Sequence, residues 1–85
     1  MFKEEIKISS ENGLHARPAS LIVSVTAKYK CDIGFIKNEK YYNAKSIISV
    51  ISMGAKRGDQ IQIVAKGEDA EGAIKKVVDI FSGLD

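Results

Sequence analysis

Hydrophobic and polar residues alternate along four short segments of the chain, with the period of two that is typical of strands. These segments are residues 2–8, 31–35, 41–44 and 60–66. Residues 37–40 form a tight connection between the second and third segments, which predicts a hairpin. The turn type stays open, because its central pair is Asn38-Glu39 rather than the favoured Asn-Gly.

Three other segments space their hydrophobic residues as helices do. The first is expected to begin near Ala16, because a proline such as Pro18 fits the first turn of a helix. Its expected buried stripe is Leu21, Ile22, Val25 and Tyr29. Ser46 before an apolar run and Gly54 after it predict a short second helix, although the β-branched residues of that run also suit a strand. Asp69 is the expected N-cap of the third helix. The buried stripe of that helix is expected to be Ala70, Ala73, Ile74, Val77, Val78 and Phe81.

The order strand, helix, strand, strand, helix, strand, helix indicates an α+β protein. We expect a four-stranded antiparallel sheet with three helices on one face, an open-faced β-sandwich. With 85 residues and no internal repeat or linker, residues 1–85 are expected to form a single domain.

The small numbers of cysteine and histidine residues exclude several classes of function. The chain has one Cys and one His, which excludes an internal disulfide and the usual zinc sites, and no cofactor is expected. The net charge is only +2 and no basic block occurs, so a nucleic-acid partner is not indicated. No segment resembles a signal peptide or a membrane span, so we expect a cytoplasmic monomer that does not insert into a membrane.

The single histidine, His15, stands at the predicted start of the first helix. The positive field of a helix N-terminus favours a neutral, nucleophilic imidazole, and the free amides of Ala16 and Arg17 suit a bound phosphate. The Arg17 guanidinium can pair with phosphate oxygens, and Gly13 permits an unusual turn before the histidine. These residues could accept and hold a phosphoryl group. The alternative is that His15 is only a surface or capping residue.

The segment Asn12-Gly13-Leu14-His15-Ala16-Arg17-Pro18-Ala19-Ser20 resembles the active-site motif of the HPr family, the histidine-containing phosphocarriers of the phosphoenolpyruvate-dependent sugar phosphotransferase system. The resemblance covers nearly the whole chain. It implies that His15 receives a phosphoryl group on Nδ1 from phospho-enzyme I and passes it to enzyme IIA of a sugar permease. It also implies that Arg17 stabilises the phosphate, and that the protein is a carrier rather than an enzyme.

Ser46 carries a second resemblance, because the matching serine of Gram-positive relatives is phosphorylated by HPr kinase/phosphorylase and the product binds the regulator of catabolite repression CcpA. A mainly regulatory interaction module is therefore the alternative function. Relatives usually continue Met-Gly-Val-Met after the isoleucine that follows this serine, whereas this chain has Ile48, Ser49, Val50 and Ile51. The residues expected to dock partners are Leu14, Ser20, Lys45, Ile47, Ile48, Ile51 and Ser52. Leu14, Ile47, Ile48 and Ile51 are expected to form a small exposed apolar patch next to His15, and the alternative is that two of them belong to the core.

Overall fold

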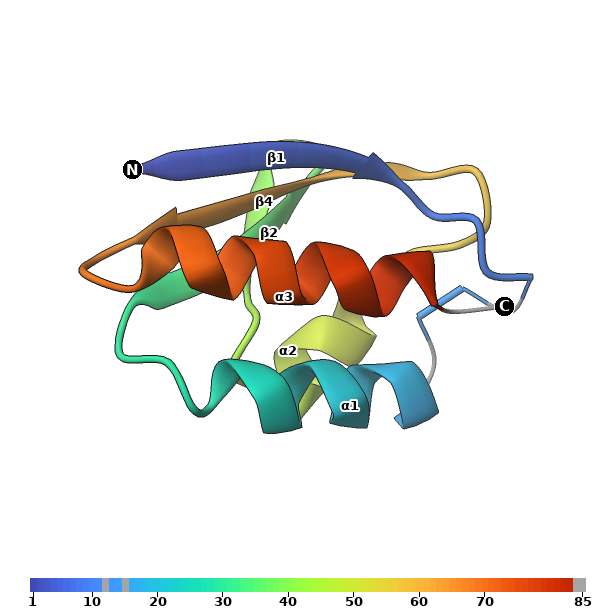
Figure 1. Cartoon of the computed structure of the whole chain (residues 1–85). Coiled ribbons are helices and arrows are strands. Elements are labelled where there is room, and N and C mark those ends of the chain that lie inside the picture. The colour runs from blue at the N-terminus through green and yellow to red at the C-terminus, as the bar shows by residue number, and fades with distance from the viewer. Residues whose placement is uncertain (12, 15, 84–85) are drawn as a thin grey trace.

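The computed structural model of the chain describes residues 1–11, 13–14 and 16–83. Its elements follow the predicted order (Figure 1). They are β1 (Phe2–Lys7), α1 (Ala16–Thr26), β2 (Asp32–Lys37), β3 (Lys40–Asn43), α2 (Ile47–Ser52), β4 (Gln60–Lys66) and α3 (Ala70–Ser82). The segment after Ser46 is a helix and not a strand, which decides the alternative that the sequence left open.

The strands form one antiparallel sheet in the order β1-β4-β2-β3. The core-facing residues of neighbouring strands lie opposite each other, as in the pairs Ile6 with Ile61 and Phe35 with Ile63. All three helices lie on the same side of the sheet, with α3 directly against it and α1 farther away (Figure 1). The predicted open-faced β-sandwich is therefore confirmed.

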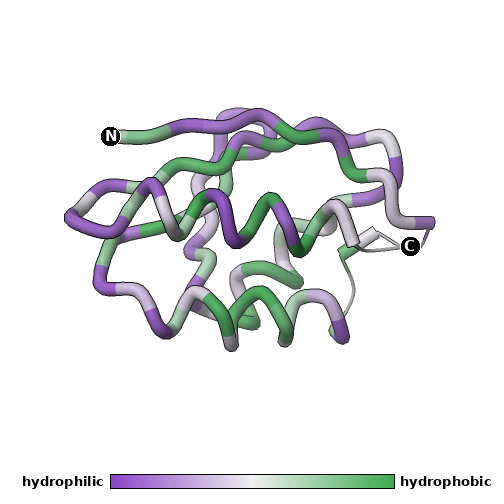
Figure 2. The backbone as a smooth tube through the Cα atoms, in the orientation of Figure 1, coloured by the Kyte–Doolittle hydropathy of each residue, from purple (hydrophilic) through white to green (hydrophobic). Residues whose placement is uncertain are grey.

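The hydrophobic core fills the space between the sheet and the helices, where the green stretches of the backbone face one another (Figure 2). Its largest fully buried side chain is Phe35 of β2, which meets the ring of Phe81 from α3 edge to face at a centroid distance of 5.9 Å. Among the large apolar side chains of α1, that of Ile22 is the most deeply buried in this core. One core thus joins the sheet to both long helices.

The hairpin between β2 and β3 has a two-residue loop in which both central residues have positive φ, 52° at Asn38 and 68° at Glu39. This is the geometry of a type I′ turn, whose twist matches that of antiparallel strands. Asn tolerates this left-handed region better than most residues, and Glu adopts it here because the strand pairing on both sides demands it.

The buried stripe of α1 differs from the prediction. The inward residues are Pro18, Ala19, Ile22 and Thr26, whereas Leu21 is 47% exposed. Successive residues are about 100° apart around a helix, so a buried face centred between Ile22 and Ala19 turns Leu21 outward. The helix also ends at Thr26, before the predicted stripe residue Tyr29.

Asp69 stands at the N-cap position of α3, but its side chain makes no capping hydrogen bond to this helix, so the predicted side-chain cap is wrong. Its two carboxylate oxygens accept hydrogen bonds from the amides of Lys30 and Cys31, each at 2.9 Å. These amides, Lys30 first, lower the pKa of Asp69. The carboxylate therefore joins the loop before β2 to the start of α3, a contact between segments far apart in sequence.

Candidate functional site

The predicted phosphoacceptor, His15, lies outside the described residues, and so does Asn12. The chain is described on both sides of the histidine. Helix α1 begins at Ala16, the residue that follows His15 in the sequence, so the predicted helix start is confirmed. The candidate site is therefore built from Gly13 and Leu14 on one side and from the first turn of α1 on the other.

Gly13 packs tightly against the segment that precedes β4. Its φ is +64°, and a Cβ atom placed on it would lie 2.3 Å from the carbonyl oxygen of Ala55. The next amide, that of Leu14, donates a hydrogen bond to the same carbonyl at 3.0 Å. Only glycine combines this backbone angle with this close approach. The backbone leading to His15 is thus held directly on Ala55.

Leu14 was expected in an exposed docking patch, and this expectation is wrong. Its side chain is only 4% exposed and belongs to the hydrophobic core. The hydrogen bond from its amide to Ala55 holds the backbone close to the molecule, so the apolar side chain packs inward. A partner protein therefore meets other residues near the site.

The first turn of α1 presents exposed Ala16 and Arg17, followed by buried Pro18 and Ala19. It contains no acidic residue that would neutralise the positive end of the helix. Pro18 has no amide hydrogen, so the free backbone donors of this turn come from the residues around it. The turn can receive an anion, with the cationic side chain of Arg17 beside it.

Helix α2 exposes most of its large apolar side chains. Ile47, Ile48 and Ile51 are 39%, 75% and 43% exposed, whereas Val50 is buried. The expected apolar patch is present for these three residues, and Leu21 is a further exposed apolar side chain on the adjacent helix α1. The four residues Leu21, Ile47, Ile48 and Ile51 are called the apolar patch below. Leu21 was missed because its spacing from Val25 is that of a core residue.

Polar residues predicted to dock partners are divided between free and engaged groups. Ser20 is exposed, and the exposed Ser52 donates its hydroxyl to the carbonyl of Ile48 at 2.6 Å. Lys45 is half-buried, and its Nζ donates to the carbonyl of Tyr29 at 2.7 Å, just after the C-terminal end of α1. Its ammonium group therefore joins two segments of the chain.

Ser46 is the N-cap of α2, as predicted. Its φ and ψ are −116° and 119°, and its Oγ accepts a hydrogen bond from the amide of Ser49 at 3.3 Å. The hydroxyl of Ser49 points elsewhere and accepts from the amide of Asn43 at 3.0 Å. The half-buried Ser46 hydroxyl thus caps the N-terminus of α2.

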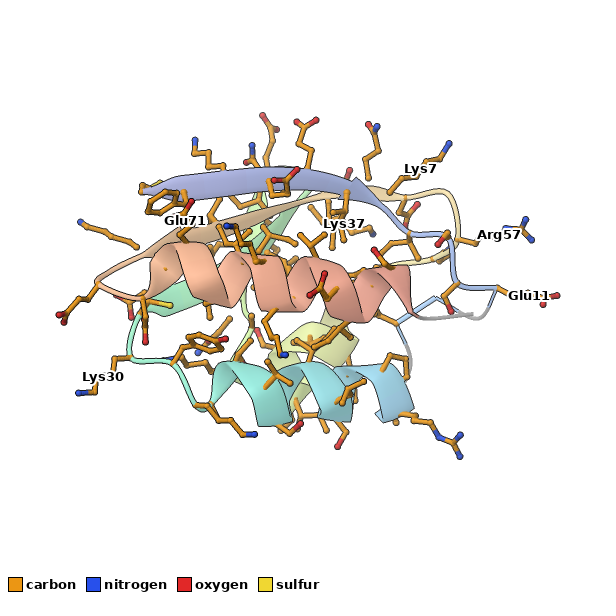
Figure 3. All side chains as sticks on the ribbon, viewed as in Figure 1. Lys7, Glu11, Lys30, Lys37, Arg57 and Glu71 are labelled. Carbon is orange, nitrogen blue, oxygen red and sulfur yellow. The ribbon has the colours of Figure 1, made fainter. Side chains whose placement is uncertain are left out.

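Charge is distributed unevenly along the sequence. The ranges 12–31 and 40–58, which include α1 and α2, contain no Asp or Glu. The basic residues in them are Arg17, Lys28, Lys30, Lys40, Lys45, Lys56 and Arg57. In Figure 3, Arg57 points away from the turn before β4 and Lys30 from the loop after α1. These ranges carry positive charge without acidic residues, so they suit contact with acidic groups better than with basic ones.

The described residues show neither a metal site nor a membrane span. Across residues 1–11, 13–14 and 16–83, no three His, Cys, Asp or Glu side chains are grouped as metal ligands. In the same part of the chain, no helix has the length and apolar character needed to cross a bilayer. The sole cysteine, Cys31, is buried and free.

Comparison with known proteins places this architecture in a family. Residues 2–82 match the family model described as PTS HPr component phosphorylation site. The phosphocarrier protein HPr of Mycoplasma capricolum is 43% identical over 77 residues, covering 91% of this chain and 86% of its own. The crystal structure of HPr-C-His from Thermoanaerobacter tengcongensis is 40% identical with a TM-score of 0.92, covering 96% of this chain and 92% of its own. The structure of Crh, the Bacillus subtilis catabolite repression containing protein, is 30% identical with a TM-score of 0.77, covering 96% and 94% of the two chains.

The fold and these similarities define a small phosphocarrier protein. The chain belongs to the HPr family. It is a component of the phosphotransferase system that transfers a phosphoryl group as phosphohistidine, with enzyme I as donor and enzyme IIA as acceptor. Members of this family are cytoplasmic components of that system, in agreement with the expected localisation.

Proposed function

We propose that His15 is the residue of this chain that carries the phosphoryl group. The observation that supports this assignment best is that α1 begins at Ala16, directly after the only histidine of the sequence. No other side chain of the chain can form a phosphohistidine. The alternative reading of His15 as a mere capping residue is weakened by the family match, which spans this position.

In the proposed transfer, the lone pair on Nδ1 of neutral His15 attacks phosphorus. The bond between phosphorus and the donor atom of phospho-enzyme I breaks, and its electron pair stays on that atom. The amides of Ala16 and Arg17 and the Arg17 guanidinium stabilise the phosphate oxygens. The reverse sequence of bond changes delivers the group to enzyme IIA. In this scheme the attacking atom and the stabilising cation both come from the chain itself.

The assignment is tested by incubating the protein with phosphoenolpyruvate and enzyme I and measuring its mass. The wild-type chain should gain one phosphate that is stable in base and labile in acid, and His15→Ala should gain none. Arg17→Ala should slow the transfer about ten- to a hundredfold, because a charged hydrogen bond to phosphate contributes about 1.5–3 kcal/mol. Lys3→Ala is the control, since Lys3 is an exposed cation of β1 that lies outside ranges 12–31 and 40–58. Uptake of acid-labile phosphate by His15→Ala would disprove the assignment.

We further propose that enzyme I and enzyme IIA dock on the apolar patch and on the basic residues around it. A single exposed apolar residue is common on protein surfaces, whereas three on one short helix are typical of a surface that a partner protein covers. The absence of acidic residues from ranges 12–31 and 40–58 favours partners with acidic docking surfaces. Ser20, Lys45 and Ser52 are proposed to lie at the edge of the contact. HPr kinase/phosphorylase and CcpA are proposed to use the same face.

Regulation through Ser46 is the second proposed function. A phosphate on Ser46 would stand at the start of α2, where the free amides of the helix tolerate a dianion. It would also add negative charge to a face that otherwise attracts acidic partners. The similarity to Crh, a protein described by its role in catabolite repression, supports a regulatory role beside transport.

Labelling with ATP and HPr kinase/phosphorylase tests this second role. Wild-type protein should be modified once and Ser46→Ala not at all, with Ser82→Ala, an exposed serine at the end of α3, as the control. Equal labelling of Ser46→Ala would exclude the site. If the wild-type chain takes label from ATP but none from phosphoenolpyruvate and enzyme I, the mainly regulatory alternative is correct.

A further inference from the structure

Lys37 is a charged residue in the interior part of the molecule that the transfer scheme does not use. It is the last residue of β2, and its side chain is only 17% exposed. Its Nζ donates a hydrogen bond to the carbonyl of Met53 at 3.3 Å and pairs with Asp59 Oδ2 at 3.6 Å. In Figure 3 the labelled Lys37 side chain stays within the outline of the molecule, whereas Arg57 projects outward. One ammonium group thus contacts both ends of residues 53–59, called the support segment below.

Asp59 fixes its end of the support segment through further bonds. Its Oδ2 also accepts from the amide of Lys56 at 2.9 Å, which closes the turn before β4. Its backbone carbonyl accepts from the amide of Ile8 at 2.8 Å. Met53, at the other end, is the C-cap of α2. The pair Lys37 and Asp59 therefore sets the distance between the end of α2 and the start of β4.

The chain that leads to His15 rests on this support segment at two places. Near its beginning, Ile8 exchanges hydrogen bonds with the segment, donating to Asp59 and accepting from the amide of Gly58 at 2.8 Å. Near its end, the amide of Leu14 donates to Ala55, with Gly13 in close contact with the same carbonyl. Leu14 immediately precedes His15. A shift of the support segment would therefore move the backbone of Leu14.

We propose that Lys37 and Asp59 are positioning residues for phosphoryl transfer, acting through the support segment on the backbone that leads to the phosphoacceptor. This inference rests on the proposed role of His15. Neither side chain belongs to the apolar patch or to the first turn of α1, so their effect is on geometry and not on docking. An ion pair that is partly open to water adds little to global stability, so its loss is expected to leave the fold intact. Transfer between two proteins nevertheless depends on placement, and an error of about 1 Å can lower a rate about a hundredfold.

The experiment compares Lys37→Met with Lys3→Met, which removes the same charge from an exposed position of β1. The rate of phosphorylation by enzyme I is measured as a function of carrier concentration. Lys37→Met should lower kcat about tenfold and leave KM within about twofold of the wild type, as expected when transition-state placement and not binding is lost. Lys3→Met should leave both parameters unchanged. Lys37→Arg, which keeps the charge and the donors, should recover most of kcat.

Amide hydrogen exchange of Leu14 provides a readout that does not depend on activity. Loss of the Lys37 contacts should speed exchange of this amide about tenfold relative to amides in the middle of β4, because its acceptor Ala55 moves. A kcat of Lys37→Met equal to that of Lys3→Met, or unchanged exchange at Leu14, would overturn the proposal. If Lys37→Met fails to fold, Asp59→Asn breaks the same pair and is held to the same outcomes. Failure of the His15 assignment would look different, because His15→Ala would then still be phosphorylated.

Discussion

The hydroxyl of Thr26 is the feature whose removal gives the sharpest test of the packing between α1 and the rest of the molecule. Thr26 has no exposed surface, and its Oγ1 donates to the carbonyl of Ala44 at 2.8 Å. Ala44 is the residue between β3 and the segment that carries Ser46. The substitution Thr26→Val keeps the shape of the side chain but removes the donor. It leaves the Ala44 carbonyl buried without this partner.

An unsatisfied buried acceptor costs about 1–3 kcal/mol, so the free energy of unfolding of Thr26→Val should fall by about 2 kcal/mol. For a domain of this size a loss of 2 kcal/mol corresponds to a decrease in Tm of about 8–16 °C. Urea and thermal unfolding followed by circular dichroism measure both quantities. Because Thr26 lies at the end of α1 opposite to Ala16, phosphorylation at 20 °C should change little.

Ser24→Ala is the matched control for this measurement. Ser24 lies on the same helix and its hydroxyl also donates to a backbone carbonyl, that of Leu21 at 2.8 Å, but in an exposed position. Water can replace this bond, so the expected change is within about 0.5 kcal/mol. If Thr26→Val destabilises the protein no more than Ser24→Ala does, the reasoning from the buried hydrogen bond is wrong.

Three further predictions concern acid stability, partner docking and thiol reactivity. The backbone amide of Lys56 lowers the pKa of Asp59, and that of Lys30 lowers the pKa of Asp69. These ionised carboxylates therefore stabilise the folded protein fully above the unfolded pKa of about 4, and this stabilisation is lost as pH falls through the lower folded pKa. Tm measured from pH 6 to pH 2 should therefore fall less steeply for Asp69→Asn than for wild type, and parallel curves would contradict this. Ile48→Asp changes a side chain that is 75% exposed, so Tm should hardly change while KM for enzyme I rises about fivefold or more; an unchanged KM would remove Ile48 from the docking face. Burial raises the pKa of the Cys31 thiol, which is 2% exposed, so a thiol reagent at pH 7.5 should label it only after denaturant is added.

Periodicity together with cap and turn residues predicted the order of the elements, because each element here carries a clear local signal. The short helix α2 is bounded by Ser46 and Gly54, and the observed cap geometry follows from those two residues. The start of α1 at Ala16 follows from Pro18 in the same way. Such signals act within one turn of the chain, so they can be recognised without knowledge of the fold.

The sequence predictions are wrong where a side chain can act either within its own element or in contact with a distant segment. Asp69 could cap its own helix, but the amides of Lys30 and Cys31 lie within reach and donate hydrogen bonds to its carboxylate instead. Leu14 and Leu21 look interchangeable as apolar residues near a helix start. The first is buried by its backbone bond to Ala55, and the second is turned outward by the orientation of α1.

By itself, the sequence determined the fold class, the candidate phosphoacceptor and the family, because strand and helix periods, caps and the motif around His15 are all local. Only the tertiary structure decided which apolar side chains remain exposed and which polar groups link distant segments. It brought Lys37 to Met53 and Asp59, and the same support segment to the backbone before the histidine. Those contacts join residues more than a dozen positions apart, and their geometry depends on how the sheet and helices pack as a whole.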